Sequence, residues 1–194
     1  MDYGPWTVDV TFVSHSPDLS PDVLARASRV TALVLDVDGV LSDGRIIYDE
    51  FGDELKCFDV QDGAGLILWR RAGLVCGIIT ARKSRLVKRR AKELRVDFLS
   101  QRILGSKLAA YEQFVKRFRL LPEQICAMAD DLMDLPILQR VGFAVAVPNA
   151  VEEIKTASHY CTQRPGGRGA VREVIDLILK AKGLWQEAME PYHI

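Results

Sequence analysis

The chain has 194 residues, 48% hydrophobic and 27% charged, a composition typical of one globular domain with a sizeable core. Its 26 Lys and Arg residues balance its 26 Asp and Glu residues, and because nucleic-acid-binding proteins usually carry a basic excess, we expect no nucleic-acid partner. No apolar run reaches the length that spans a bilayer, and residues 1–20 lack an apolar leader core, so we expect no membrane association.

The first part of the chain contains a short helix, a buried strand and a hairpin. Residues 1–20 are expected to form a loosely structured lead-in, and Pro21–Arg29 then predicts a helix that begins at a proline. An apolar strand, residues 33–35, runs directly into Asp36-Val37-Asp38-Gly39. Two β-leaning runs around a polar, glycine-containing turn predict a hairpin over residues 45–58.

From Asp62 onward, helical and strand-like segments alternate along the chain. The predicted helices cover residues 62–72, 83–94, 106–118, 132–140, 151–156 and 170–182, and the predicted strands cover 74–80, 97–99, 124–128, 143–147 and the vicinity of Tyr160. This alternation predicts an α/β fold with a doubly wound parallel sheet, Rossmann-like, over a single domain spanning residues 1–194. Residues 183–194 form a C-terminal tail that either docks on a neighbouring chain or stays loose.

The cysteines favour a reducing compartment. The chain has four, which are widely spaced and include no CxxC pair. Cys76 and Cys126 lie inside apolar strand-like runs, where a cysteine usually acts as a small hydrophobic residue. We therefore expect a cytoplasmic protein.

Two carboxylates directly follow the first predicted strand. Asp36 and Asp38 are two positions apart, so an extended backbone points them the same way. Gly39 has no side chain to obstruct a ligand that approaches the main chain. Carboxylates suit Mg²⁺, and an aspartate can be a phosphoryl nucleophile. The alternative is a solvated turn in which an aspartate caps the next element.

Polar residues of matching chemistry follow other strands. Thr80 ends one strand, Lys107 opens a helix, and Asp130 and Asp131 end another strand, with Asp134 one helical turn later. Each has a structural alternative, as a helix cap or as surface charge. Together they place acids, a hydroxyl and an ammonium at one edge of the sheet. That combination is what phosphoryl transfer requires.

These motifs resemble a known family. Asp36-Val37-Asp38-Gly39-Val40, Thr80, Lys107 and Asp130-Asp131 are similar to the four motifs of the haloacid dehalogenase superfamily. The longer runs at residues 35–44, 129–136 and 166–173 resemble the 3-deoxy-D-manno-octulosonate 8-phosphate phosphatases within it. The similarity extends from about Pro21 to the C-terminal tail.

The resemblance implies a role for each matched residue. Asp36 would be the nucleophile that forms an aspartyl-phosphate, and Asp38 the acid and then the base. Thr80 and Lys107 would hold phosphate oxygens. Asp36, the backbone carbonyl of Asp38, and Asp130 would hold Mg²⁺. The substrate site would be lined by Asp59, Val60, Gln61, Asp62, Gly63, Arg82 and Arg90. The run Gly166-Gly167-Arg168-Gly169 forms either a backbone nest for an anion, with Arg168 at the substrate, or a plain glycine turn.

The chain departs from the family pattern at three places. Thr80-Ala81-Arg82 stands where Thr-Gly-Arg is usual, and Ala129 stands where glycine precedes the aspartate. Asp59-Val60-Gln61-Asp62-Gly63 stands where Asn-x-Arg-Asp-Gly is common. A guanidinium is therefore replaced by an amide and a carboxylate is added, which leaves the identity of the sugar acid open.

The spacing of the motifs leaves no room for a cap domain. The hairpin and one helix occupy the chain between Asp38 and Thr80, so the site is expected to be covered by a neighbouring subunit or by the substrate itself. The hairpin carries the apolar residues Ile46, Ile47, Tyr48 and Phe51, more than a free hairpin usually exposes. We therefore expect a homo-oligomer, which the resemblance suggests is a homotetramer, with this flap completing a neighbour's site. The alternative is a flap that folds back on its own sheet.

The leading functional hypothesis is Mg²⁺-dependent hydrolysis of 3-deoxy-D-manno-octulosonate 8-phosphate, a step in lipopolysaccharide precursor synthesis. The altered segment at residues 59–61 favours, as an alternative, the 9-phosphate of an N-acylneuraminate or of keto-deoxynonulosonate. A third possibility, from a different class, is a catalytically idle phosphatase-like oligomerisation module.

Overall fold

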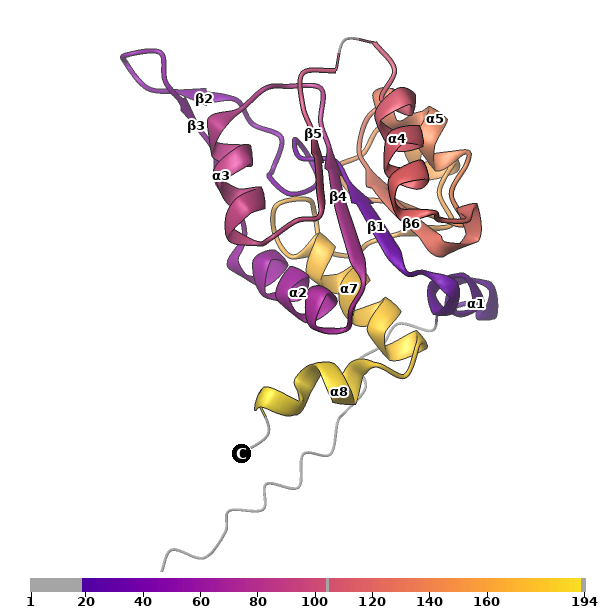
Figure 1. Ribbon diagram of the computed structural model, residues 1–194. Coiled ribbons are helices and arrows are strands. Elements are labelled where there is room, and N and C mark those ends of the chain that lie inside the picture. The colour runs from indigo at the N-terminus through magenta and orange to yellow at the C-terminus, as the bar shows by residue number, and fades with distance from the viewer. Residues whose placement is uncertain (1–18, 104, 193–194) are drawn as a thin grey trace, which may run out of the picture.

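Six parallel strands form one sheet in the order β5-β4-β1-β6-β7-β8 (Figure 1). The computed structural model describes residues 19–103 and 105–192, so almost all of the predicted lead-in lies outside the described residues. The strands are β1 (Ala32–Leu35), β4 (Val75–Ile79), β5 (Phe98–Ser100), β6 (Ile125–Ala129), β7 (Phe143–Ala146) and β8 (Tyr160–Cys161). The predicted doubly wound α/β sheet is confirmed.

Helices cover both faces of this sheet. Figure 1 shows α2, α3 and α7 on one face, and α4 and α5 on the other. The α-helices are α1 (Pro21–Arg29), α2 (Val60–Arg71), α3 (Arg85–Glu93), α4 (Leu108–Phe118), α5 (Leu135–Leu138), α6 (Glu152–Thr156), α7 (Ala170–Ala181) and α8 (Trp185–Met189). Because strands β1, β6 and β7 are covered on both sides, every residue in them is buried, which explains their unbroken apolar runs.

The predicted helix at 132–140 is split in the structure. A 3₁₀ turn, Leu132–Asp134, comes first, and α5 follows with Pro136 in its first turn. Proline has no backbone N–H and is tolerated at the start of a helix but not in its interior, so one continuous helix cannot form here. The 3₁₀ turn brings Asp134 to the end of β6, next to Asp130.

The C-terminal tail packs on its own chain as far as the structure describes it. α8 and the 3₁₀ turn Glu190–Tyr192 follow α7, and α8 contacts both α2 and α7. Lys180 Nζ lies 5.0 Å from the centre of the Trp185 ring, and the Arg71 guanidinium lies 5.2 Å from that of Tyr192. The prediction of a loose tail is therefore wrong up to Tyr192, whereas docking of the tail on a neighbouring chain stays a prediction.

The hairpin forms a separate two-stranded antiparallel sheet. Its strands are β2 (Ile47–Tyr48) and β3 (Glu54–Leu55), and Figure 1 shows it projecting from the body of the molecule. Its apolar side chains are exposed, with Phe51 at 84%. The alternative in which the flap folds back on its own sheet is therefore wrong.

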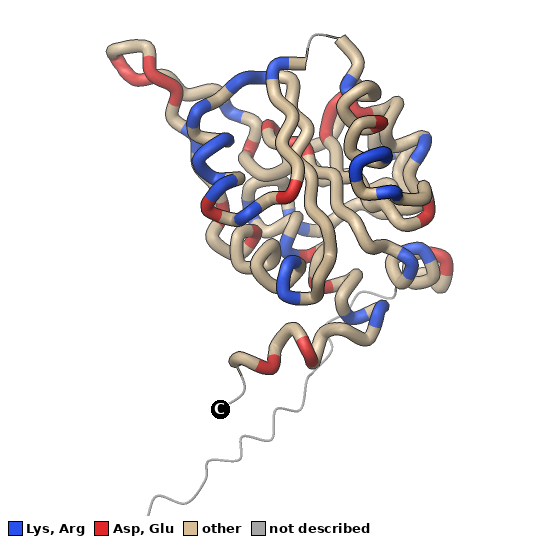
Figure 2. Tube along the Cα trace, viewed as in Figure 1, with Lys and Arg blue, Asp and Glu red and all other residues tan. Residues whose placement is uncertain are grey.

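Charge is unevenly distributed over the surface. Figure 2 shows lysines and arginines gathered along α3, and acidic residues in the hairpin. Among the helices that the structure describes, none is both long and apolar enough to cross a membrane.

Candidate active site

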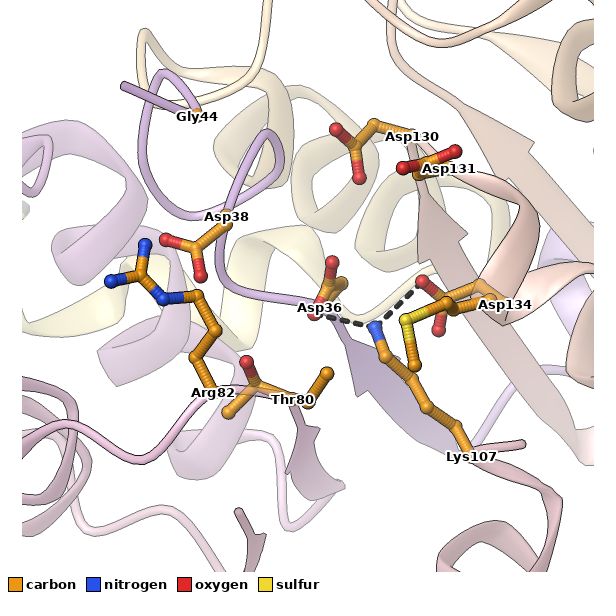
Figure 3. Close-up of a pocket in the computed structure, with 11 residues that line it drawn as sticks. Asp36, Asp38, Gly44, Thr80, Arg82, Lys107, Asp130, Asp131 and Asp134 are labelled. Carbon is orange, nitrogen blue, oxygen red and sulfur yellow. Dashed lines mark hydrogen bonds and ion pairs between the residues drawn. The ribbon is translucent and has the colours of Figure 1, made fainter. Parts of the chain in front are cut away.

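One pocket lies at the carboxyl ends of β1, β4 and β6 (Figure 3). These three strands are neighbours in a parallel sheet, so the residues that follow them emerge at the same edge. The pocket is lined by six of the predicted site residues, namely Asp36, Asp38, Thr80, Arg82, Lys107 and Asp130. Asp131 and Asp134 also line it.

The loop after β1 carries the two leading carboxylates. The Asp36 N–H donates to the Met128 carbonyl on β6 at 3.3 Å, which fixes the start of the loop to the sheet. Gly39 follows with φ at +91°, a conformation that favours glycine. A Cβ at Gly39 would overlap the Asp130 carboxylate. The glycine therefore lets this carboxylate approach the loop.

The glycine loop before α7, residues 166–169, is connected by hydrogen bonds to the loop after β1. Asn149 Nδ2 donates to the Gly39 carbonyl at 2.9 Å, and Asn149 Oδ1 accepts from the Gly166 N–H at 2.8 Å. The Gly167 N–H donates to the Val40 carbonyl at 2.8 Å. Asn149 thus ties the two loops together.

The remaining amides of the glycine loop also have partners within the protein. The Arg168 N–H donates to the Pro165 carbonyl at 3.1 Å, and the Gly169 N–H donates to Asp62 Oδ2 at 3.3 Å. All four N–H groups of residues 166–169 are therefore engaged. This arrangement favours the structural glycine turn over the anion nest.

Lys107 lies between two buried carboxylates. Its ammonium is 2.7 Å from Asp36 Oδ1 and 2.7 Å from Asp134 Oδ2, as the dashed lines in Figure 3 show. Burial works against the charged amine, but the two carboxylates outweigh it and raise the pKa of Lys107 above its ordinary value. The ammonium therefore stays charged beside Asp36.

Three carboxylates, those of Asp36, Asp130 and Asp134, form a compact cluster in which one oxygen atom from each lies within 4.8 Å of the other two. Asp130 Oδ1 is buried without a hydrogen-bond partner in the described part of the chain. Burial, followed by repulsion from Asp36, raises the pKa of Asp130 and of Asp134 to about 7. Burial also raises the pKa of Asp36, although Lys107 opposes it.

This cluster has the donor set and the charge deficit of a magnesium site. Three carboxylates face a single ammonium, and oxygen ligands of this kind are those that Mg²⁺ prefers. A divalent cation would neutralise the repulsion among these carboxylates, which adds to the effect of burial on their pKa values. Asp134 is not among the ligands predicted from the sequence. Its position one helical turn after Asp130 and Asp131 is the sequence feature that could have indicated it.

Asp38 contacts a lysine that sequence reasoning missed. The buried side chain of Lys56, just after β3, forms an ion pair with Asp38 Oδ1, and its ammonium is 3.7 Å from Glu54 Oε1. Glu54 Oε1 is in turn 2.9 Å from Arg82 Nη2. Arg82 Nη1 is buried and has no hydrogen-bond partner among the described residues, so it is a donor available at the pocket.

The predicted substrate segment forms the first turn of α2 and does not line this pocket, as far as the structure describes it. Asp59 caps the helix by accepting from the Gln61 N–H at 2.6 Å, and Arg90 Nη2 donates to the Asp59 carbonyl at 3.3 Å. Val60 is exposed, and Gly63 leaves space for the Arg90 guanidinium. These residues lie beside α3 rather than at the acidic cluster.

Two more of the predicted substrate residues, Asp62 and Gln61, contact the segment around the glycine loop. Asp62 is buried and accepts from the N–H groups of Gly169 and Arg172 at the start of α7. Burial raises the pKa of Asp62 to about 6. Gln61 Oε1 accepts from Arg164 Nη1 at 2.5 Å. Arg168, like Arg90, does not line the pocket in the described part of the chain.

Comparison with known proteins gives consistent matches. The model of the haloacid dehalogenase-like hydrolases matches residues 90–175. The 3-deoxy-D-manno-octulosonate 8-phosphate phosphatase of Escherichia coli K12 is 42% identical over 88% of this chain and 90% of its own length.

Solved structures agree. The Yersinia pestis phosphatase of the same name has a TM-score of 0.84 at 40% identity, covering 87% of this chain and 90% of that one. The Moraxella catarrhalis phosphatase, solved with magnesium, phosphate and a KDO molecule, has a TM-score of 0.85 at 39% identity, covering 89% and 98%. With such identity over most of its length, the chain belongs to the 3-deoxy-D-manno-octulosonate 8-phosphate phosphatase family of haloacid dehalogenase-like hydrolases.

Proposed function

We propose that this protein is a Mg²⁺-dependent phosphatase that hydrolyses 3-deoxy-D-manno-octulosonate 8-phosphate. The observation that carries the proposal is the convergence of Asp36, Asp38, Lys107 and Asp130 on one pocket at the edge of the sheet. The chain is 42% identical to the Escherichia coli phosphatase of that name. A structural relative was solved with magnesium, phosphate and KDO together.

In the first step, a carboxylate oxygen of Asp36 attacks the phosphorus atom. A bond forms between this oxygen and phosphorus while the bond from phosphorus to the sugar oxygen breaks. Asp38 donates a proton to the departing sugar oxygen, a transfer that typically contributes a factor of about 10²–10⁴. Lys107, held 2.7 Å from Asp36 Oδ1, and Thr80 hold phosphate oxygens.

In the second step, the Asp38 carboxylate takes a proton from a water molecule. The water oxygen attacks phosphorus and the bond to Asp36 breaks, which releases phosphate and restores both aspartates. Each step thus uses Asp38 in the opposite protonation state, while the Lys107 ammonium, 2.7 Å from Asp36 Oδ1, favours the carboxylate form of Asp36.

The Asp36, Asp130 and Asp134 carboxylates, with the backbone carbonyl of Asp38, would hold Mg²⁺. Bound there, Mg²⁺ supplies positive charge to the phosphoryl group and to the attacking oxygen. Asp130 Oδ1 has no hydrogen-bond partner within residues 19–103 and 105–192, and three carboxylates there share one ammonium, and both facts support this placement.

The sugar acid is recognised by residues outside the acidic cluster. Arg82 Nη1, which is buried and has no hydrogen-bond partner in the part of the chain that the structure describes, is suited to a substrate oxygen. At the substrate segment, Gln61 replaces the expected arginine, but Arg164 Nη1 contacts Gln61 Oε1, so a guanidinium remains at this place. The altered segment, with its added carboxylate at Asp59, favours a 9-phosphate of an N-acylneuraminate or of keto-deoxynonulosonate as the second candidate substrate.

We further propose that the protein works as a homotetramer in which the hairpin completes a neighbour's site. Ile46, Tyr48, Phe51 and Leu55 are exposed on a hairpin that projects away from the sheet. Apolar surface of this kind is usually covered by a partner. In this arrangement Asp59, Val60, Gln61, Arg90 and Arg168 act at the substrate through the assembled site. Asp62 and Gly63, which are buried, support this segment from within α2. A fully active monomer in sedimentation experiments at assay concentration would contradict this arrangement.

The reaction belongs to the synthesis of lipopolysaccharide precursors, and we propose that it takes place in the cytoplasm. The four cysteines of the chain are all free in the structure, which fits a reducing compartment.

Phosphate release from a panel of sugar-acid phosphates tests the function. We expect the highest kcat/KM with the octulosonate 8-phosphate, no release after chelation of Mg²⁺, and none from the Asp36→Asn variant. A higher kcat/KM with a 9-phosphate would support the second candidate. If folded protein released no phosphate from any substrate, the phosphatase proposal would be wrong, and an idle oligomerisation module would remain.

A further inference from the structure

Lys56 has an unusual environment for a residue at the end of a hairpin strand. Its side chain is only 2% exposed, whereas its neighbour Leu55 points to solvent. Lysine is almost never fully buried unless its ammonium is paired. Here the ammonium is paired with Asp38 Oδ1 and lies 3.7 Å from Glu54 Oε1. The chain therefore turns this lysine inward, toward the pocket.

Lys56 is the only side chain among the described residues that donates a hydrogen bond to the Asp38 carboxylate. Asp38 stands on a loop, and in Figure 3 it lies on the Arg82 side of Asp36, opposite Lys107. Lys107 therefore contacts Asp36 and Asp134, and does not orient Asp38. The direction of the Asp38 carboxyl group depends on Lys56.

The lysine is itself anchored to the main sheet. Glu54 Oε1 lies between the Lys56 ammonium and Arg82 Nη2, at 3.7 Å and 2.9 Å respectively. Arg82 comes just after β4, so this contact links the hairpin to the strand end that carries Thr80. The chain of contacts Arg82, Glu54, Lys56, Asp38 joins the flap to the reacting centre.

We propose that Lys56 is a positioning residue for proton transfer, an inference that rests on the phosphatase function proposed above. By holding Oδ1 of Asp38, Lys56 leaves Oδ2 as the atom that carries the proton to the leaving sugar oxygen. Lys56 neither touches the substrate nor transfers the proton. Because a misplacement of about 1 Å can cost two orders of magnitude in rate, the orientation of this carboxyl group controls the first step.

The leaving group of the substrate provides a specific test. An alkyl phosphate needs a proton from Asp38 when the ester bond breaks, whereas p-nitrophenyl phosphate releases a phenolate that needs none. The value of kcat/KM reports only the steps up to the aspartyl-phosphate, so it isolates the proton donation. We expect Lys56→Met to lower kcat/KM for the alkyl phosphate about 100-fold and for the aryl phosphate less than about fivefold.

Three further variants complete the test. Lys56→Arg keeps a charged donor and should recover part of the kcat/KM for the alkyl phosphate. Lys88 is exposed on α3, and Lys88→Met should leave kcat/KM unchanged for both substrates. Glu54→Gln weakens only the contact of Lys56 and Arg82 with Glu54. It should lower kcat/KM for the alkyl phosphate more than for the aryl phosphate, but by less than Lys56→Met does. This variant provides a second test if Lys56→Met does not fold. Calorimetric binding of inorganic phosphate should be unchanged in Lys56→Met.

The outcomes separate the two proposals. Equal losses of kcat/KM on both substrates, or no loss on either, would overturn the role of Lys56 while leaving the phosphatase in place. A wild-type protein that hydrolyses neither ester would refute the phosphatase function and this inference with it.

Discussion

Two buried lysines, Lys107 and Lys56, each lie between a pair of carboxylates, but they come from different parts of the molecule. Lys107 stands at the start of α4, within the α/β scaffold, and contacts Asp36 and Asp134. The side chains of Asp36 and Asp134 are 9% and 7% exposed, so water has little access to this centre. Charges in such surroundings interact strongly and are costly to leave unpaired.

Lys56 stands at the base of the hairpin, and its partners are more accessible. The side chains of Asp38 and Glu54 are 23% and 18% exposed. Water can therefore reach these carboxylates, which suits the proposed role of Asp38 in exchanging protons with the substrate and with water. The comparison suggests a division of tasks, in which the scaffold organises nucleophilic attack and the flap organises proton transfer.

Loss of Lys107 should give the largest effect. Lys107→Met leaves the Asp36 and Asp134 carboxylates without their shared ammonium. We expect kcat to fall by about 10²–10³, as when one donor to a developing charge is removed. The free energy of unfolding should fall by about 3–5 kcal/mol, because the remaining charges are buried.

Lys56→Met is the matched control for stability. Its carboxylate partners can rehydrate, so urea unfolding should show a clearly smaller loss than for Lys107→Met. If the free energy of unfolding fell equally in the two variants, the proposed difference in water access around Lys107 and Lys56 would be wrong.

The metal site should depend on the scaffold centre and not on the flap. Asp130→Asn removes one of three clustered carboxylates, and we expect Mg²⁺ affinity to fall more than about tenfold, the effect of losing even an outer partner of a metal. Calorimetric titration of Mg²⁺ measures this directly. Asp131→Asn is the control, since Asp131 lies outside the cluster. Lys56→Met should also keep the affinity, and a tenfold loss in either control would contradict the assignment.

Alanine substitutions at two glycines with positive φ, Gly39 and Gly52, compare the loop after β1 with the hairpin turn. Gly39→Ala puts a side chain at φ +91°, costing about 1–2 kcal/mol, and pushes the Asp130 carboxylate away. Gly52→Ala, in the hairpin turn at φ +84°, has the same strain but no atom within 4 Å of the added Cβ. Both variants should lose stability from this strain in urea unfolding, and Gly39→Ala should lose more because it also displaces the Asp130 carboxylate; only Gly39→Ala should lose Mg²⁺ binding and activity. Equal activity in the two would show that the close approach of Asp130 is unimportant.

The smallest effect is expected at the substrate segment. Arg164→Ala removes the hydrogen bond to Gln61, an exposed contact worth about 0.5–1.5 kcal/mol. We expect KM for the sugar-acid phosphate to rise by roughly twofold to tenfold, with kcat unchanged. Steady-state kinetics with p-nitrophenyl phosphate, which lacks the sugar acid, should show no change. A fall in kcat with both substrates would place Arg164 in the chemistry instead.

The sequence could predict the sheet and the residues that end its strands, because those features are local. The apolar run before Asp36 and the acids after β6 follow from the position of each residue in its own strand. The parallel order then brings the strand ends together without further information. The predicted residues at these ends all line one pocket.

What sequence reasoning missed depends on tertiary placement. Lys56 contacts Asp38 only because the hairpin turns its last residues back toward the sheet, and no periodic pattern encodes that direction. Asp134 reaches the cluster because Pro136 shortens the helix that was expected at 132–140. Likewise, α8 is a five-residue helix whose stability comes from packing on α2 and α7 rather than from its own sequence.

Trapping the phosphorylated enzyme tests most directly the claim that Asp36 is the nucleophile and Asp38 the proton carrier. An Asp38→Asn variant given p-nitrophenyl phosphate needs no proton for the first step but lacks the base for the second. Acid quenching followed by peptide mapping should find phosphate accumulating on Asp36, and none in the variant that also carries Asp36→Asn. Phosphate on any other residue, or no covalent species while turnover continues, would contradict the account.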